Sequence, residues 1–175
     1  MRKLFFLLLF TITAGTAFSQ APAGKPCSNS NYRQFDFWIG EWEAYGVNGK
    51  KAGDSKIEML LDSCIILENW SSVTVTNGIR YAGKSYNSYN AATSKWQQYW
   101  VDNAGGVTEY FNGHYENNKM ILETANVKQP DGSSKIMKMT FYNLSPDKVR
   151  QHGESSTDNG VTWKTDFDLE YRRKK

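Results

Sequence analysis

The stretch that decides the fold runs from Ile65 to Tyr89 and reads IILENWSSVTVTNGIRYAGKSYNSY. Aromatic and β-branched residues alternate with polar ones on both sides of Asn77-Gly78, a pair that favours a two-residue hairpin turn. The stretch therefore predicts two antiparallel strands, Ile65 to Val75 and Arg80 to Tyr89, joined directly to each other.

The same texture of short alternating stretches and Gly, Asn, Asp or Pro turns continues along the chain. We expect an all-β protein with about ten strands and a short helical turn between 32 and 38. The remaining strands are expected at 38–45, 56–61, 96–102, 108–115, 119–127, 135–143, 149–154 and 163–171. Short turns favour an antiparallel up-and-down meander, and closure into a barrel would remove its exposed edges. A barrel of this width is expected to enclose a lumen.

The N-terminus has the pattern of an export signal. Arg2 and Lys3 supply positive charge, an apolar run follows, and 17–19 carries small residues at the positions that a signal peptidase reads. We expect cleavage near Ser19, which makes residues 1–19 a signal peptide, 20–34 a flexible lead-in and 35–173 one barrel domain. The mature protein would lie in the periplasm or outside the cell. A retained anchor is disfavoured because the apolar run is short.

The net charge limits the classes of partner that we expect the protein to bind. Loss of the signal peptide would lower the formal net charge from +3 to +1, which argues against a nucleic-acid partner. We expect no stable membrane insertion, and the sequence leaves the oligomeric state open.

An even cysteine count in an exported chain suggests a disulfide between Cys27 and Cys64, the alternative being two free thiols. Only two histidines and no C-x-x-C spacing leave little basis for a metal centre, and we expect no cofactor.

Residues 156–163 read STDNGVTW and match the Asp-box pattern S-x-D-x-G-x-T-W of sialidase propellers. The chain has one copy and no internal repeat, which argues against a propeller. Asp158 and Gly160 suit a tight turn, with Trp163 packed beneath it. We interpret the motif as the hairpin between the last two strands.

Several stretches together resemble a bacterial, often exported family called domain of unknown function 1579. They are FDFWIGEW at 35–42, CIILENW at 64–70, GKSYNSY at 83–89, KWQQYWVD at 95–102 and the Asp-box. The resemblance covers about 35–173, although Ser63 and Asn159 stand where the family more often has Gly. It implies a lipocalin-like, calycin-type barrel and supplies no catalytic residues, because the family has no settled activity.

In lipocalin-type barrels the first strand carries G-x-W, which matches 40–42 here. An arginine of the last strand packs across that tryptophan. The resemblance therefore implies that Arg172, or next Arg173, packs on Trp42 and closes one end of the barrel.

Alternation along the strands assigns candidate faces to the lumen. If the tryptophan faces point inward, the lumen candidates are Glu68, Trp70, Ser85, Asn87, Trp96, Gln98, Trp100, Asp102, Arg150 and Glu154. Apolar walls with a few polar groups are typical of a small-molecule pocket. The alternative is a filled core with a Glu68–Arg150 ion pair. A one-residue slip of register would also move every side chain to the other face.

We expect the barrel to bind a small, partly apolar molecule and to catalyse nothing. One alternative is a hydrolase, acting on carbohydrate through a carboxylate pair from Glu68, Asp102 and Glu154. Another is a ligand-free structural or interaction domain of the cell envelope. His114 and His152 are expected to be ordinary histidines, with an acid–base role or haem ligation as a minor option.

Overall fold

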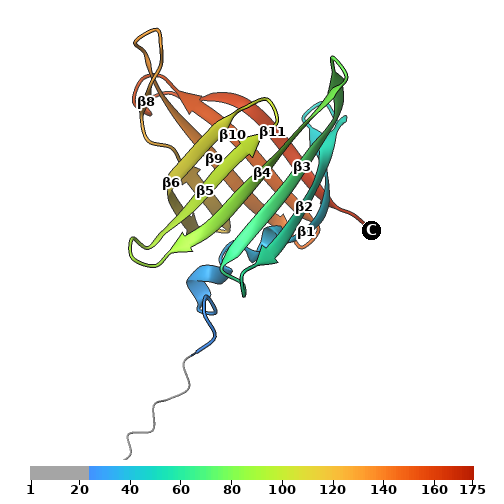
Figure 1. Ribbon diagram of the computed structural model, residues 1–175, viewed down its shortest axis with the longest axis vertical. Helices are drawn as coiled ribbons and strands as arrows, with labels where there is room; N and C mark the ends of the chain where they lie inside the picture. Colours follow the sequence, from blue (N-terminus) through green and yellow to red (C-terminus); the bar gives the residue numbers. More distant parts are fainter. Residues whose placement is uncertain (1–23) are drawn as a thin grey trace, which may run out of the picture.

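The computed structural model describes residues 24–175 (Figure 1). The expected signal peptide and the first part of the lead-in lie outside the described residues. Two short 3-10 helices, η1 Ser30–Arg33 and η2 Asp36–Trp38, precede the strands. The strands are β1 Gly40–Gly46, β2 Lys51–Leu60, β3 Ile65–Thr76, β4 Ile79–Asn90, β5 Lys95–Asp102, β6 Val107–Glu116, β7 Lys119–Glu123, β8 Val127–Lys128, β9 Ser134–Ser145, β10 Lys148–Ser156 and β11 Lys164–Arg173.

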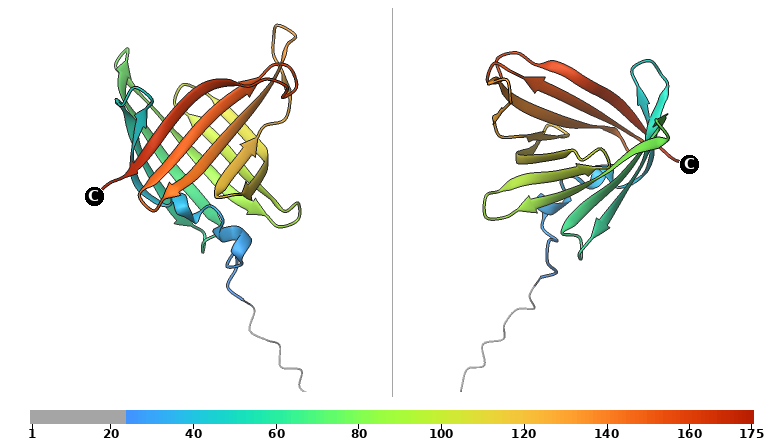
Figure 2. Two further views of the ribbon diagram at one scale, coloured as in Figure 1. Left: turned by 180° about the vertical axis from the view of Figure 1, so that it is seen from behind. Right: turned by 45° about the horizontal axis from the view of Figure 1, so that its top comes forward.

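Ten of these strands form a closed antiparallel barrel with an up-and-down order, as the sequence predicts (Figures 1 and 2). β11 pairs with β1, and β10 pairs with both β11 and β9, so the sheet closes on itself. β8 is an addition of two residues that pairs only with the start of β9. Closure pairs both edges of the meander and so removes them.

The β3–β4 hairpin turns at the expected residues. Asn77 and Gly78 both have positive φ, 51° and 76°, and Thr76 pairs with Ile79. This conformation matches the twist of the flanking strands. One expected strand is wrong: 119–127 breaks after Glu123, where Thr124 makes only an isolated bridge to Tyr110.

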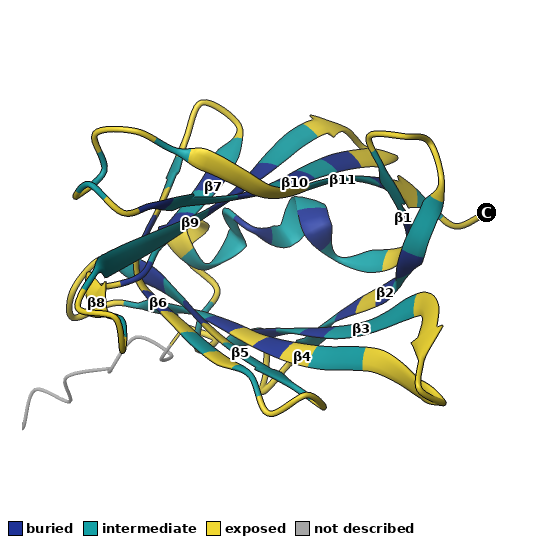
Figure 3. Ribbon diagram, turned by 90° about the horizontal axis from the view of Figure 1, so that it is seen from above, coloured by how far each residue is buried: buried dark blue, intermediate teal, exposed yellow. Residues whose placement is uncertain are grey.

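The segment with the two 3-10 helices enters one end of the barrel and fills it (Figure 3). Phe35 and Trp38 are fully buried, stacked 5.1 Å apart between ring centroids. Phe141 lies 4.9 Å from Phe35 and 4.5 Å from Trp38, and Trp96 lies 5.8 Å from Phe35. These aromatic rings, which we call the aromatic plug, close this end of the barrel.

A disulfide joins Cys27 to Cys64, which confirms the expected pair. It ties the lead-in to the turn between β2 and β3. The Arg33 guanidinium donates a hydrogen bond to the Ser63 carbonyl of the same turn. Covalent and polar contacts therefore both hold the segment with the two 3-10 helices, which we call the plug segment, against the barrel.

Arg173, not Arg172, packs on Trp42. The Arg173 guanidinium carbon lies 4.2 Å from the Trp42 ring centroid, whereas that of Arg172 lies 4.1 Å from the Tyr45 ring. The expectation for Arg172 is wrong because Tyr171 faces the interior, which turns the next residue outward and Arg173 inward again.

The Asp-box forms the turn between β10 and β11. The Asp158 carboxylate accepts hydrogen bonds from the Thr162 amide, at 2.8 Å, and from the Ser156 hydroxyl, at 2.7 Å. Asn159 and Gly160 have positive φ, and the Trp163 indole donates to the Gly160 carbonyl at 3.0 Å. The arrangement is a hairpin turn at the molecular surface, and outside it Asn126 donates to the Asn159 side-chain oxygen at 2.6 Å and the Lys138 ammonium lies over the Trp163 ring.

Candidate functional site

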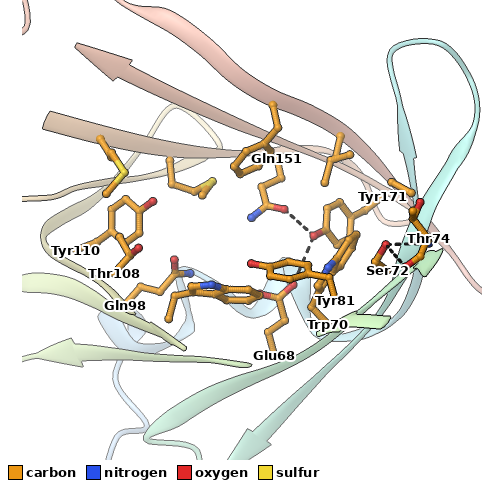
Figure 4. A pocket seen from close by; sticks show the side chains of 16 residues that line it. Glu68, Trp70, Ser72, Thr74, Tyr81, Gln98, Thr108, Tyr110, Gln151 and Tyr171 are labelled. Atoms are coloured by element: carbon orange, nitrogen blue, oxygen red, sulfur yellow. Dashed lines mark hydrogen bonds between the residues drawn. The ribbon is translucent and has the colours of Figure 1, made fainter. Parts of the chain in front are cut away.

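The barrel interior holds a cavity of about 490 Å³ beyond the aromatic plug (Figure 4). It extends toward the end that carries the β1–β2, β3–β4 and β5–β6 turns. Its lining comes from nearly every strand: Ala52, Glu68, Trp70, Ser72, Thr74, Tyr81, Gln98, Trp100, Thr108, Tyr110, Met137, Met139, Gln151, Phe167, Leu169 and Tyr171. Aromatic, thioether and aliphatic side chains form most of this surface.

Two tryptophans of the wall lie against glycines of the preceding strands. A Cβ on Gly53 would stand 2.7 Å from the Trp70 ring, and a Cβ on Gly83 would overlap the Trp100 ring. Trp70 reaches from β3 toward β2, and Trp100 from β5 toward β4. Glycine at both places lets each indole ring lie close to the sheet, which leaves the centre of the barrel open.

The polar part of the cavity centres on Glu68. Its side chain is almost fully buried, with 2% of the residue exposed. Its Oε1 accepts hydrogen bonds from the Ser55 hydroxyl at 2.9 Å and the Tyr171 hydroxyl at 3.4 Å, and its Oε2 accepts from the Ser85 hydroxyl at 3.1 Å. The Tyr171 hydroxyl lies closer to the Gln151 side-chain oxygen, at 2.6 Å (Figure 4).

A chain of amides supports Glu68 from β4 and β5. The Gln98 amide donates to the Asn87 side-chain oxygen at 2.7 Å, and the Asn87 amide donates to the Ser85 hydroxyl at 3.0 Å. Strand register explains the chain, because Glu68 pairs with Ser85 and Asn87 pairs with Gln98. Each group donates in the direction of the carboxyl.

Burial controls the protonation of this site. Desolvation raises the pKa of the Glu68 carboxyl to about 7, against the lowering effect of its three hydroxyl donors. Burial, with the neighbouring Glu68 carboxyl, also raises the pKa of Tyr171 well above its ordinary value. Desolvation therefore outweighs the hydrogen bonds at Glu68.

The structure brings some of the sequence candidates together and not others. Glu68, Trp70, Gln98 and Trp100 line the cavity. Ser85 and Asn87 lie buried behind them and hold Glu68 and Gln98 in place. Trp96 belongs instead to the aromatic plug, where its indole donates to Gln34 at 3.0 Å.

Asp102 lies at the β5–β6 turn rather than beside Glu68. Its carboxylate accepts from the Tyr81 hydroxyl at 3.0 Å, the Trp100 indole at 3.2 Å and the backbone amides of Ala104 and Gly106. It therefore orients two lining rings and shapes the turn.

Arg150 and Glu154 do not face the lumen, so this part of the expected site is wrong. Arg150 makes two hydrogen bonds to Asp168, at 2.8 and 2.7 Å, and Glu154 pairs with Lys138 at 3.1 Å. Val149, Gln151 and Gly153, the alternate positions of β10, are buried, and so is Ser156, beyond the register shift that follows Gly153. The expected alternative of a Glu68–Arg150 ion pair is excluded by the same geometry.

Among the lining residues that the sequence did not predict are Tyr81, Tyr110, Gln151 and Tyr171. Leu169 and Tyr171 show the alternation that could have assigned an inner face to β11. For Gln151 the signal was weak, because apart from Val149 the inner face of β10 carries an amide and a glycine.

The two histidines, which were the other candidates for acid–base chemistry or haem ligation, do not line the cavity. His114 lies 4.0 Å from Glu116 with much of its side chain exposed, and His152 lies 3.0 Å from the Thr165 hydroxyl on the same strand face as Arg150. Across residues 24–175, no group of three or more His, Cys, Asp or Glu residues could hold a metal ion. That part of the chain also contains no helix long and apolar enough to cross a membrane.

Fold and cavity define a closed antiparallel β-barrel with an internal pocket. No protein-family model matches the chain, and a search of curated proteins also found no match.

Proposed function

We propose that this protein binds a small, partly apolar molecule in its barrel lumen and does not transform it. The observation that carries the proposal is the cavity of about 490 Å³, whose apolar walls surround a few polar groups. Its volume falls in the range of small-molecule pockets, about 300–1,000 Å³. The rings would supply contact area, and Glu68, Gln98 and Gln151 would orient the ligand.

The arrangement of carboxylates favours binding over glycoside hydrolysis. That chemistry uses two carboxyl groups on either side of the scissile bond. Asp102 is engaged by the β5–β6 turn, and Glu154 by Lys138 on the other face of β10. Glu154 therefore cannot act opposite Glu68, and the Asp102 carboxylate is engaged by Tyr81, Trp100 and the turn.

We also propose that the protein is exported and belongs to the family that its motifs resemble. The charged and apolar N-terminal pattern supports export. The Cys27–Cys64 disulfide is compatible with an oxidising compartment.

Native mass spectrometry tests the binding function. The full coding sequence is expressed in a bacterium, and the protein purified from the periplasm is weighed under native and denaturing conditions. The lumen variant Thr108→Trp places a ring in the cavity, and the matched variant Glu109→Trp places it on the neighbouring exposed residue.

Binding predicts a reproducible native mass excess in the unmodified protein and in Glu109→Trp that is lost in Thr108→Trp. In titrations, the neutral apolar dye N-phenyl-1-naphthylamine should bind the unmodified protein and Glu109→Trp with similar affinity, and Thr108→Trp much more weakly. Equal dye affinity in all three proteins, or no dye binding in any, would contradict lumen binding.

A further inference from the structure

Glu68 is a buried acid for which the described part of the chain supplies no cation. None of the cavity-lining residues among 24–175 other than Glu68 carries a charge at neutral pH. Buried carboxylates in proteins are almost always paired, because desolvation of an isolated charge is costly. An unpaired acid that faces a cavity therefore points to a ligand that brings the positive charge.

The hydrogen bonds around Glu68 favour its ionised form. Ser55 and Ser85 each donate to one of its oxygens, and the Gln98–Asn87 chain directs its donors toward Ser85. An ionised carboxylate accepts about four hydrogen bonds, so capacity remains for a ligand. Tyr171, the third neighbour, lies closer to Gln151 and contributes only a 3.4 Å contact.

The walls around this acid are aromatic. Trp70 and Tyr171 lie 6.2 Å apart between ring centroids, and Trp100 and Tyr81 complete the same region of the cavity. Aromatic faces attract cations, and rings that surround a site are a common means of binding organic ammonium groups. Asp102, held behind Tyr81 and Trp100, adds negative potential.

We propose that the lumen selects small organic ammonium ions, with the charged nitrogen bound at Glu68 and the apolar body held between the tryptophans. This inference rests on the proposed lumen-binding function and names the class of ligand. The same features disfavour carboxylate ligands, because an anion would meet Glu68 without a counter-charge among the lining residues.

Three probes of matched shape test the selection: 4-phenylbutylamine, the neutral 4-phenylbutan-1-ol and the anion 4-phenylbutanoate. Their affinities are measured by calorimetry at pH 8 on the whole purified protein. We expect the amine to bind about 30-fold more tightly than the alcohol, as is typical when a buried charge gains its partner. The anion should bind more weakly than both.

The variant Glu68→Gln should remove the amine preference, so that the amine and the alcohol bind it with affinities within about threefold of each other. If the alcohol binds as tightly as the amine, or if the variant keeps the preference, the inference is overturned. If the inference is overturned but the dye still binds the unmodified protein and not Thr108→Trp, the proposed lumen-binding function stands. Absence of dye and probe binding would instead overturn both.

A pH series on the unmodified protein tests the inference without a variant. Burial raises the pKa of Glu68 to about 7. The titratable groups that face it are Tyr171 from β11 and Tyr81 from β4; both have raised pKa values, and β2 contributes only Ser55. Amine affinity should therefore fall about tenfold per pH unit below pH 7 and level off above it, with alcohol affinity unchanged. Amine affinity that stays constant from pH 5.5 to about 8.5 would overturn the assignment of Glu68.

Discussion

The guanidinium of Arg173, the last residue of β11, lies over the indole ring of Trp42 on β1, with its central carbon 4.2 Å from the ring centroid. It also donates to the carbonyl of Ile39 at 3.1 Å and to that of Pro146 at 2.9 Å. One side chain thus joins the β1–β11 pair, the end of the plug segment and the β9–β10 turn.

Arg173→Ala should lower the free energy of unfolding by about 1–3 kcal/mol, because it removes a cation–π contact and two charged hydrogen bonds. Arg172→Ala is the matched control. It removes a similar contact with Tyr45 from a more exposed position, so we expect a loss below about 1 kcal/mol. Urea denaturation of both variants measures the difference, and equal losses would contradict a special role for Arg173.

The disulfide should contribute about 3–4 kcal/mol to stability by closing a loop in the unfolded chain. Its cysteines are 37 residues apart in sequence. The double variant Cys27→Ser, Cys64→Ser should show this loss in urea denaturation, and added reductant should not destabilise it further. A double variant as stable as the oxidised protein would mean that plug packing alone holds the lead-in.

The sequence was sufficient for the fold where alternation and turn chemistry agree. Asn77-Gly78 fixes the β3–β4 hairpin turn, whereas the pairing of Glu68 with Ser85 depends on a register shift between Ser71 and Val75 that the turn does not report. The large rings of Trp70 and Trp100 mark the inner face of their strands, so the cavity positions of β3 and β5 could be assigned from sequence.

The rest of the site could not be assigned in this way. On β10 the inner face carries Gln151 and Gly153 beside Val149, so only one of its three positions has a hydrophobic signal, and a register shift follows Gly153. Trp96 shares a strand face with Trp100 but lies nearer the plug, a difference along the barrel axis that alternation does not report. Whether a residue of the inner face contacts the cavity or the plug depends on how far the plug segment enters the barrel. That depth is set by tertiary contacts, which strand alternation does not report.

Glu68 should make stability depend on pH. Its pKa is raised from 4.5 to about 7 in the folded protein, so between these values the unfolded chain loses a proton that the folded protein keeps. The contribution of Glu68 to the free energy of unfolding is therefore fully present below about pH 4.5. It falls by up to about 3 kcal/mol as the pH rises to about 7.

Glu68→Gln lacks this titration and serves as the reference. The difference in unfolding free energy between the two proteins, measured in urea at pH 5, 6, 7 and about 8, should shift in favour of the variant as pH rises. A difference that does not change with pH would show that Glu68 titrates alike in both states.

Gly83→Ala should displace the Trp100 ring from the barrel wall. The added Cβ would overlap that ring and stand 2.8 Å from the Val101 carbonyl oxygen, so the ring must move toward the lumen. We expect the dye affinity to fall and the free energy of unfolding to drop by about 1–3 kcal/mol, the usual cost of overpacking.

Gly46→Ala on β1 is the control, since its Cβ would meet nothing closer than the Asn48 side-chain oxygen at 3.3 Å. Shortening the opposing ring tests the cause directly: Trp100→Ala should remove most of the additional cost of Gly83→Ala in a double-mutant cycle. Gly83→Ala could still destabilise through the backbone contact with Val101, but that effect would persist in the Trp100→Ala background. Independence of the two substitutions, in both unfolding and dye affinity, would mean that Gly83 does not set the position of Trp100 on the cavity wall.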